Sequence, residues 1–275
     1  MISMSIFLIG GIVLGKIISV ANQKGGVGKT TTSITLSSML AQKNKKVLLI
    51  DADPQGNATS GVGVEKNIEK SVYDILVEET TVNEIVKETK IKNLKLCPSN
   101  INLAGAEVEL VSMMSREQRL KEKLEEVKEE YDYIIIDCPP SLGLITLNAF
   151  TASNSVLIPI QCEYYALEGL GQLINTINLV KKHLNKALEV EGALLTMYDI
   201  RTNLSNQVVN EVKKYFGDKV YKTVIPRNVK LSEAPSYGMP ITIYDSKSKG
   251  AKSYDKFVKE FLKSNEVVKR AKHMK

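Results

Sequence analysis

A glycine-rich loop follows an apolar run near the start of the chain, and it constrains the fold more than any other feature. The loop, residues 24–32, reads K-G-G-V-G-K-T-T-T, directly after the apolar residues 17–21. A strand that enters a glycine turn and then a helix presents backbone N–H groups and the helix N-terminus to an anion. Glycine avoids the clash that a Cβ would make there. The pattern therefore predicts a phosphate-binding loop.

The loop departs from the usual pattern G-x-x-x-x-G-K-[ST] at its first position, where Gln23 stands. A second lysine, Lys24, begins the loop, and the motif alone leaves open that Lys24 is simply solvated. Lys29 is placed to reach the β- and γ-phosphates, and the hydroxyl of Thr30 is placed to bind Mg²⁺. The residues predicted to bind the nucleotide here are Lys24, Gly25, Gly26, Val27, Gly28, Lys29, Thr30 and Thr31.

Two further apolar runs end in acidic residues. Residues 47–57 carry Asp51 and Asp53, and residues 133–141 carry Asp137. In an open α/β sheet, ligands bind at the carboxyl ends of the strands, so these carboxylates should share an edge with the loop. Carboxylates at such a place can hold Mg²⁺ or orient a water that attacks the γ-phosphate. A single such Asp is usually a cap or turn residue, but three beside this loop favour a nucleotide site.

Short apolar runs alternate with helical patterns along the chain. Several runs are almost wholly apolar, as buried parallel strands are. The alternation predicts an α/β fold: a mostly parallel central sheet with helices on both faces, in three layers like those of P-loop NTPases. The expected strands are 17–21, 47–50, 94–97, 133–136, 155–160, 193–197 and 220–225, and the periodic stretches between them include 30–42, 103–130, 166–184 and 204–216.

Composition narrows the functional classes. The three cysteines (Cys97, Cys138 and Cys162) are widely spaced, which favours a reducing cytoplasm over a disulfide framework or a zinc site. The net charge of +6 is uneven: residues 1–140 contain 17 Lys or Arg and 19 Asp or Glu, and residues 141–275 contain 20 and 12. A basic half is typical of proteins that bind a polyanion, although lysine-rich surfaces are also common in themselves.

The two ends of the chain set the expected domain boundaries. Residues 1–14 are an apolar extension, too short to span a bilayer as a helix. It is an extra β-like segment, a weak membrane contact or a translated leader, and we favour the leader. Residues 15–262 are expected to form a single ATPase domain and residues 263–275 a basic tail.

The motifs together resemble the deviant Walker motifs of the ParA/MinD family of dimerising ATPases. They are K-G-G-V-G-K-T, D-A-D-P-Q-G-N and Y-I-I-I-D-C-P-P-S. Residues 162–169 and 225–236 resemble the chromosomal ParA proteins, often called Soj. The resemblance runs from about residue 15 to about residue 254, and residues 1–14 fall outside it.

The resemblance implies roles for individual residues. Lys24 would cross a homodimer interface and contact ATP bound by the other subunit, and Asp53 would position the attacking water. Asp51 and Asp137, with Thr30, would organise Mg²⁺, while Pro226 and Asn228 match the segment that meets the adenine base.

The resemblance also implies partners. ParA dimers bind double-stranded DNA without sequence preference, and Arg201 and Lys230 match the family's DNA-contacting positions. Position 230 is arginine in relatives, so lysine keeps the charge but loses the bidentate fork. A centromere-bound ParB-type protein would stimulate hydrolysis and release the dimer, and the protein would be cytoplasmic and associated with the nucleoid.

Two other classes of protein share parts of this sequence pattern. A MinD-like, membrane-associated positioning ATPase would use the C-terminal segment from Tyr254 as an amphipathic anchor, whereas the ordinary reading packs the same apolar stripe on the sheet. We expect no stable membrane association. A metabolic enzyme of the same fold, such as a nitrogenase-reductase-like protein or an amidotransferase-type synthase, is less favoured, because the cysteines lack cluster spacing.

Overall fold

The computed structural model describes residues 15–163 and 169–273. The N-terminal extension, residues 1–14, lies outside the described residues. So do residues 164–168, which belong to one of the segments that carry the family resemblance.

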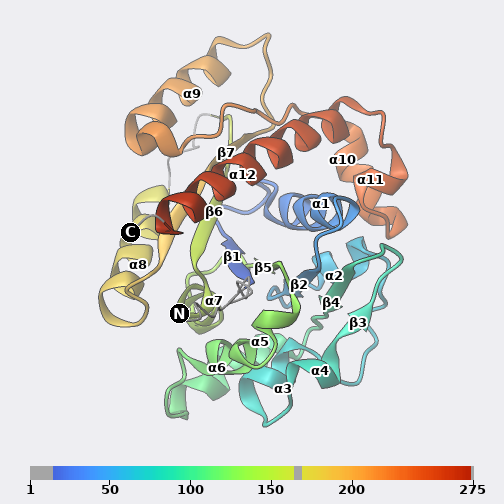
Figure 1. Cartoon of the computed structure of the whole chain (residues 1–275), viewed down its shortest axis with the longest axis vertical. Coiled ribbons are helices and arrows are strands. Elements are labelled where there is room, and N and C mark those ends of the chain that lie inside the picture. Colours follow the sequence, from blue (N-terminus) through green and yellow to red (C-terminus); the bar gives the residue numbers. More distant parts are fainter. Residues whose placement is uncertain (1–14, 164–168, 274–275) are drawn as a thin grey trace, which may run out of the picture.

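A seven-stranded sheet forms the centre of the molecule, in the order β3-β4-β2-β5-β1-β6-β7 (Figure 1). All neighbouring pairs are parallel except β3 with β4, which confirms the predicted mostly parallel sheet. The strands are β1 (Lys16–Val20), β2 (Val47–Asp51), β3 (Lys87–Glu88), β4 (Leu94–Cys97), β5 (Tyr133–Asp137), β6 (Ser155–Gln161) and β7 (Glu189–Thr196).

The expected strand at 220–225 is wrong. This segment contacts the edge strand β7 through one isolated bridge, Ala193 with Val220, and through the N–H groups of Tyr221 and Ile225, which donate to the carbonyls of Ala193 and Leu195 at 3.0 and 2.8 Å. The reason is that the N–H groups of Lys222 and Thr223 donate to the carboxylate of Glu260, at 2.7 and 3.0 Å, instead of joining a ladder. The short strand β3 was not predicted, because its two residues are exposed and charged and give no apolar signal.

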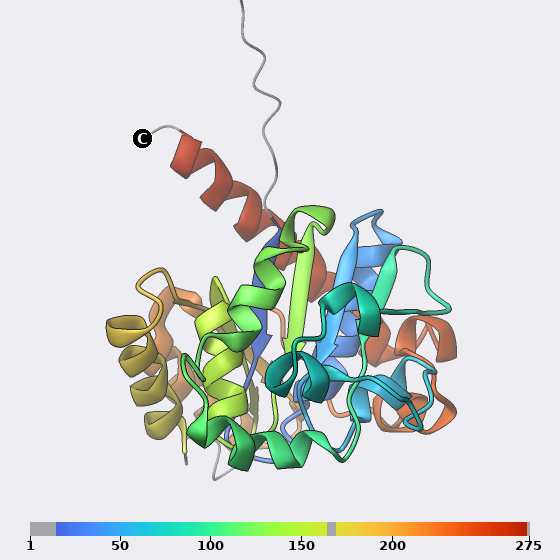
Figure 2. The ribbon, with the colours of Figure 1, turned by 90° about the horizontal axis from the view of Figure 1, so that it is seen from below.

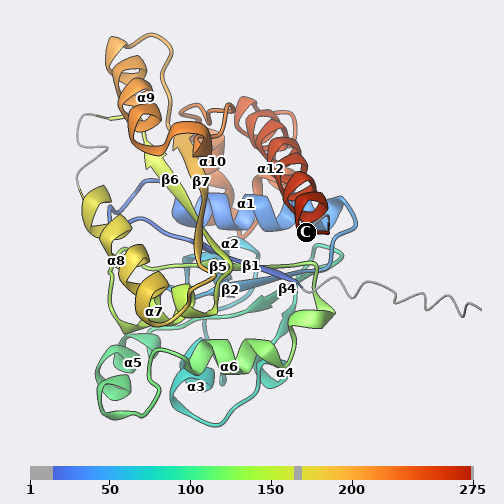
Figure 3. The ribbon, with the colours of Figure 1, turned by 60° about the vertical axis from the view of Figure 1, so that its left-hand side comes forward.

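Helices cover both faces of the sheet (Figure 3). Helices α1, α2, α10, α11 and α12 bury their apolar residues on one face, and α3 to α9 bury theirs on the other. The helices are α1 (Lys29–Gln42), α2 (Asn57–Gly61), α3 (Val72–Val77), α4 (Val82–Ile85), α5 (Leu103–Glu109), α6 (Arg119–Glu125), α7 (Leu144–Ala152), α8 (Leu170–His183), α9 (Asn203–Phe216), α10 (Val229–Glu233), α11 (Ile241–Tyr244) and α12 (Lys249–His273). Residues 15–163 and 169–273 also contain four 3₁₀ turns: η1 (Leu110–Ser112), η2 (Lys128–Glu130), η3 (Gly217–Lys219) and η4 (Ala234–Tyr237).

Alternation along the strands divides the core between the two faces. Ile134 and Ile136 of β5 belong to the cluster under α3–α9, whereas Tyr133 and Ile135 belong to the cluster under α1 and α12. This is the period of two expected for a strand that is buried on both sides. The periodic stretch 103–130 is not one helix: it is divided into α5, η1, α6 and η2, and Ser115 between them has a φ of 52°.

The last helix packs its apolar stripe against the sheet. Tyr254, Phe257, Val258 and Phe261 of α12 are at most 1% exposed and belong to the core under α1. The apolar residues proposed for a membrane anchor are therefore used in the core at these positions. The helix continues beyond residue 262 and its C-terminal part projects past the sheet (Figure 2). Within the described chain, no helix combines the length and apolar character that crossing a membrane requires.

The aromatic packing of α12 gives a stability prediction. Phe257 is fully buried and its ring meets that of Tyr221 edge-on at 4.8 Å. Phe257→Ala should lower the free energy of unfolding by about 3–5 kcal/mol, because it removes buried apolar surface and leaves a cavity. Lys256→Ala, at the exposed neighbouring position, should change it by less than about 0.5 kcal/mol. Denaturant unfolding of both variants measures the difference, and equal effects would contradict this packing.

Candidate active site

The predicted phosphate loop lies between β1 and α1. Gly26 and Gly28 have φ values of 73° and 89°, which L side chains rarely adopt. A Cβ built on Gly25 or Gly26 meets no atom within 4 Å, so the loop borders open space. The side-chain amide of Asn22 holds the loop to β6 by donating to the carbonyl of Pro159 at 2.7 Å. The loop therefore forms an open cradle at the N-terminus of α1.

The two lysines of the loop occupy different positions. Lys29 is buried, and its Nζ donates to the carbonyl of Lys24 at 3.2 Å. Burial lowers the pKa of Lys29, and the charge of Asp137 opposes that shift. Lys24 is half-buried and lines a hollow of about 500 Å³ with Gln23, Gly169 and their neighbours. Lys29 thus points into its own loop, whereas Lys24 borders space outside it.

Asp51 and Asp137 are paired in register on neighbouring strands, and both are fully buried. One oxygen of Asp51 accepts hydrogen bonds from the N–H and the hydroxyl of Thr59, both at 2.7 Å. Burial raises the pKa of Asp51 to about 6. Burial, and then the charge of Asp51, raise the pKa of Asp137 to about 8. Two carboxyls that lie together at such depth resist losing both protons.

Asp137 also has an unused oxygen. Its Oδ1 accepts from the hydroxyl of Ser33 at 2.8 Å, but its Oδ2 is buried without a hydrogen-bond partner among the described residues. Asp53 is 9% exposed and accepts from the N–H of Gln55 at 2.9 Å. Its own N–H donates to Asp51 at 3.2 Å. The three predicted carboxylates therefore lie at the same edge of the sheet, beside the loop, but their carboxylate groups do not converge on one point.

A hollow of about 230 Å³ joins the loop to the segment after the 220–225 region. Its lining includes Gly28, Thr31, Pro226, Asn228 and Tyr254. Asn228 caps α10 by accepting from the N–H of Lys230 at 3.1 Å. The two residues predicted to meet a base are thus brought beside the phosphate loop, although they are almost 200 positions away in the sequence.

Arg201 and Lys230 do not line this cradle. Arg201 lies between β7 and α9, with Nε and Nη2 at 2.9 and 2.6 Å from the carboxylate of Asp199. Lys230 lies on α10 and its Nζ is 2.9 Å from Glu233. Both side chains are exposed and each is already paired with an acid. These pairs could not be inferred from the motif.

Several residues that build the site were missed by the sequence reasoning. Ser33 bonds Asp137 and Thr59 bonds Asp51, while the hydroxyl of Tyr254 lies 2.9 Å from that of Thr32. Thr196 also donates to the carbonyl of Val27 at 2.8 Å. Only Ser33 carried a usable signal, because it lies four residues after Lys29 on the same face of α1.

Comparisons with known proteins agree with this geometry. Residues 15–190 match the family described as an AAA domain. The sporulation initiation inhibitor protein Soj of Bacillus subtilis (strain 168) is 65% identical over 248 residues, which cover 90% of this chain and 98% of that protein. The chromosome partitioning protein ParA of Myxococcus xanthus (strain DK1622) is 54% identical over 251 residues, covering 91% and 89%.

A solved structure is similar over the same range. Cobyrinic acid a,c-diamide synthase from Mycobacterium smegmatis, with bound ATP analog and magnesium, has a TM-score of 0.80 and 38% identity, and the match covers 90% of this chain and 94% of that one. The chain has the loop with its second lysine and the three carboxylates, and it is 65% identical to Soj and 54% identical to ParA. It therefore belongs to the ParA/Soj family of chromosome-partitioning ATPases.

Proposed function

We propose that this protein is a Mg-ATP-dependent ATPase whose ATP-bound homodimer binds DNA without sequence preference and is released when a ParB-type partner stimulates hydrolysis. The observation that carries the proposal is the open glycine cradle with Lys24 and Lys29, beside three carboxylates on the same sheet edge. ATPase activity is the activity of the family to which the chain belongs. The dimer, the DNA and the ParB-type partner are the parts that need testing.

The residues of the cradle fit ATP and Mg²⁺. Open space at Gly25 and Gly26 leaves room for phosphates, which the loop N–H groups would bind. The unpartnered Oδ2 of Asp137, and the raised pKa values of Asp137 and Asp51, are features that a bound cation would relieve. Among the described residues, no three His, Cys, Asp or Glu side chains form a metal cluster, so the hydroxyl of Thr30 and the phosphates would complete the shell.

The chain's own residues account for the chemistry. Magnesium, when bound with ATP, supplies positive charge against the phosphates. Lys29 binds the β- and γ-phosphates. Val27 and Thr31 lie on either side of Lys29 and Thr30 in the phosphate loop. Asp53 accepts a hydrogen bond from the attacking water and orients it. Pro226 and Asn228 border the hollow that would hold the base. Lys24 adds a second cation to phosphates enclosed between two subunits.

Partitioning is favoured over the two other classes. The relatives named for chromosome partitioning in Myxococcus xanthus and Treponema pallidum are 54% and 52% identical, whereas the synthase structure is 38% identical. A MinD-like anchor is disfavoured because Tyr254, Phe257, Val258 and Phe261 of α12 are buried in the core. Action on the chromosome would place the protein in the cytoplasm, at the nucleoid.

The buried carboxyls predict how stability depends on pH. Folding raises the pKa of Asp51 and Asp137, so the stability that their protons confer is complete below about pH 4 and is lost as pH rises toward about 8. In the nucleotide-free protein, Asp137→Asn should reduce this loss of stability. The reduction should be about 1.4 kcal/mol for each unit of difference between the folded and unfolded pKa values that the substitution removes. Denaturant unfolding between pH 5 and 8 measures the slope, and an unchanged slope would contradict the assignment.

Replacing Lys24, the second lysine of the loop, should prevent dimerisation. Lys24→Ala should leave ATP binding largely intact, because Lys29 and the loop N–H groups remain, but should abolish the ATP-dependent dimer. Light scattering after size-exclusion chromatography with ATP and Mg²⁺ measures the mass. Lys92→Ala, at an exposed position on the far end of the sheet, is the matched control. A dimer in both variants would remove the role assigned to Lys24.

Replacing Asp53, the third carboxylate, should separate ATP binding from ATP hydrolysis. Asp53→Ala should keep the ATP-bound dimer and reduce hydrolysis at least about 100-fold, because the attacking water loses its acceptor. Phosphate release and dimer mass, measured on one preparation, test both halves. Glu65→Ala removes an exposed acid nearby and should hydrolyse ATP at the normal rate. Normal hydrolysis by Asp53→Ala would exclude the assigned role.

A further inference from the structure

The segment after Asp53 turns back toward the end of β2 and brings a threonine onto Asp51. Gly56 makes this turn possible, because its φ is 60° and a Cβ at this position would lie 2.9 Å from the carbonyl oxygen of Ser99. Helix α2 starts directly after this glycine. Thr59 of α2 thereby reaches the carboxylate of Asp51, eight positions earlier in the chain.

The hydroxyl of Thr59 is hydrogen-bonded on both sides. The backbone N–H of Ser99, in the loop after β4, donates to the hydroxyl oxygen at 2.9 Å, and the hydroxyl donates to Oδ2 of Asp51 at 2.7 Å. A hydroxyl has a single proton, and because its oxygen accepts from Ser99, that proton is directed at Asp51. The N–H of Thr59 donates to the same carboxylate oxygen at 2.7 Å. All three residues are fully buried, so solvent does not compete for these bonds.

These bonds fix the rotation of the Asp51 carboxylate. Its Oδ2 accepts two hydrogen bonds, which uses both lone pairs, whereas its Oδ1 accepts one, from the N–H of Asp53 at 3.2 Å. Asp137 follows the same scheme: Oδ1 accepts from Ser33 at 2.8 Å, and Oδ2 has no partner among the residues that the structure describes. Each buried acid therefore has one oxygen held by a hydroxyl and one oxygen with capacity for a further ligand.

We propose that Thr59, itself held by Ser99, is a positioning residue that fixes the orientation of Asp51 for Mg²⁺. The inference rests on the proposed role of Asp51 at the magnesium site and adds a residue that the motifs did not assign. Thr59 acts through Asp51, because its hydroxyl proton and its N–H are both used by that carboxylate. Hydrogen-bond partners of this kind orient the groups that hold a metal, and losing one typically costs about 10- to 100-fold in metal affinity.

The alternative is a purely structural hydroxyl that only ties α2 to the sheet. In that case, removing it would lower the free energy of unfolding but would not change how Mg²⁺ affects nucleotide binding. The N–H of Thr59 keeps its own bond to Asp51 in a variant with the same fold, so a side-chain substitution isolates the hydroxyl. The two roles therefore differ in a binding measurement, even where they agree in a stability measurement.

The test measures the affinity of the full chain for ADP, once with saturating Mg²⁺ and once with EDTA. ADP avoids both hydrolysis and the ATP-dependent dimer. By linkage, the ratio of the two ADP affinities equals the ratio of the Mg²⁺ affinities of bound and free ADP. Thr59→Val, which removes the hydroxyl, should lower this ratio at least about tenfold and leave the affinity in EDTA unchanged, because the phosphate loop is intact. Thr59→Ser keeps the hydroxyl and should keep the wild-type ratio.

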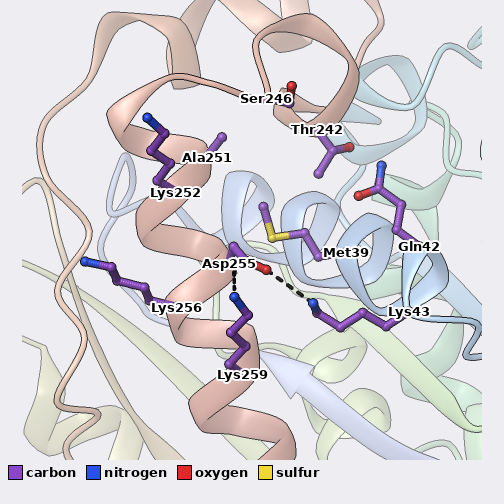
Figure 4. Close-up of a pocket in the computed structure, with 10 residues that line it drawn as sticks. All are labelled: Met39, Gln42, Lys43, Thr242, Ser246, Ala251, Lys252, Asp255, Lys256 and Lys259. Carbon is purple, nitrogen blue, oxygen red and sulfur yellow. Dashed lines mark hydrogen bonds and ion pairs between the residues drawn. The ribbon is translucent and has the colours of Figure 1, made fainter.

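Thr242→Val is the matched control. Thr242 is half-buried at a hollow of about 570 Å³ between α1 and α12 (Figure 4), and its hydroxyl lies 3.4 Å from that of Ser38. The substitution is chemically the same as at Thr59 but is made away from the carboxylates. It should therefore keep the wild-type ratio.

Two results would overturn the proposal. One is a wild-type ratio in Thr59→Val together with a reduced ratio in Asp51→Asn. The other is an equal loss of ADP affinity with and without Mg²⁺, which indicates a structural defect. If Thr59→Val does not fold, Thr59→Ala removes the same hydroxyl without placing a methyl group against the N–H of Ser99, and the same ratio decides. A wild-type ratio in Asp51→Asn would instead remove Asp51 from the proposed magnesium site, and the role of Thr59 with it.

Discussion

The site depends on two carboxylates buried side by side at the carboxyl ends of β2 and β5. Burying two adjacent acids is costly unless they are neutralised, and here both pKa values rise in response. The fold holds them in place with hydroxyls, from Thr59 to Asp51 and from Ser33 to Asp137. One oxygen of Asp137 has no described partner. A bound cation would also offset the charge of these carboxylates, which supports the proposal that Mg²⁺ and phosphates occupy the loop beside them.

Helix α12 joins that site to the outer surface. Tyr254 borders the hollow beside the loop, and its hydroxyl meets Thr32 on α1, two residues after Thr30. Asp255 holds the end of α1 through Lys43, and Lys256 faces the hollow shared with Arg201. The consecutive residues Tyr254, Asp255 and Lys256 thus face the hollow beside the loop, the end of helix α1 and the basic surface around Arg201, respectively.

The sequence predicted the sheet, the loop and the three carboxylates because each depends on local spacing. Buried strands are read from apolar runs, and their order places Asp51 and Asp137 on one edge. The prediction failed at 220–225, where a distant carboxylate, Glu260, accepts from the N–H groups of Lys222 and Thr223 in the middle of the expected strand. The pairing of Arg201 with Asp199 and the role of Thr59 were equally out of reach. Those contacts depend on side-chain directions, which a one-dimensional pattern does not contain.

In the proposed function, ATP converts this chain into a DNA-binding dimer. The most direct measurement is DNA binding by the purified protein without nucleotide, with ADP, and with ATP and Mg²⁺, at two salt concentrations and on two unrelated sequences. We expect binding that requires ATP, weakens steeply with salt and does not depend on the DNA sequence. Binding that is equal in all nucleotide states, or absent from all of them, would contradict it.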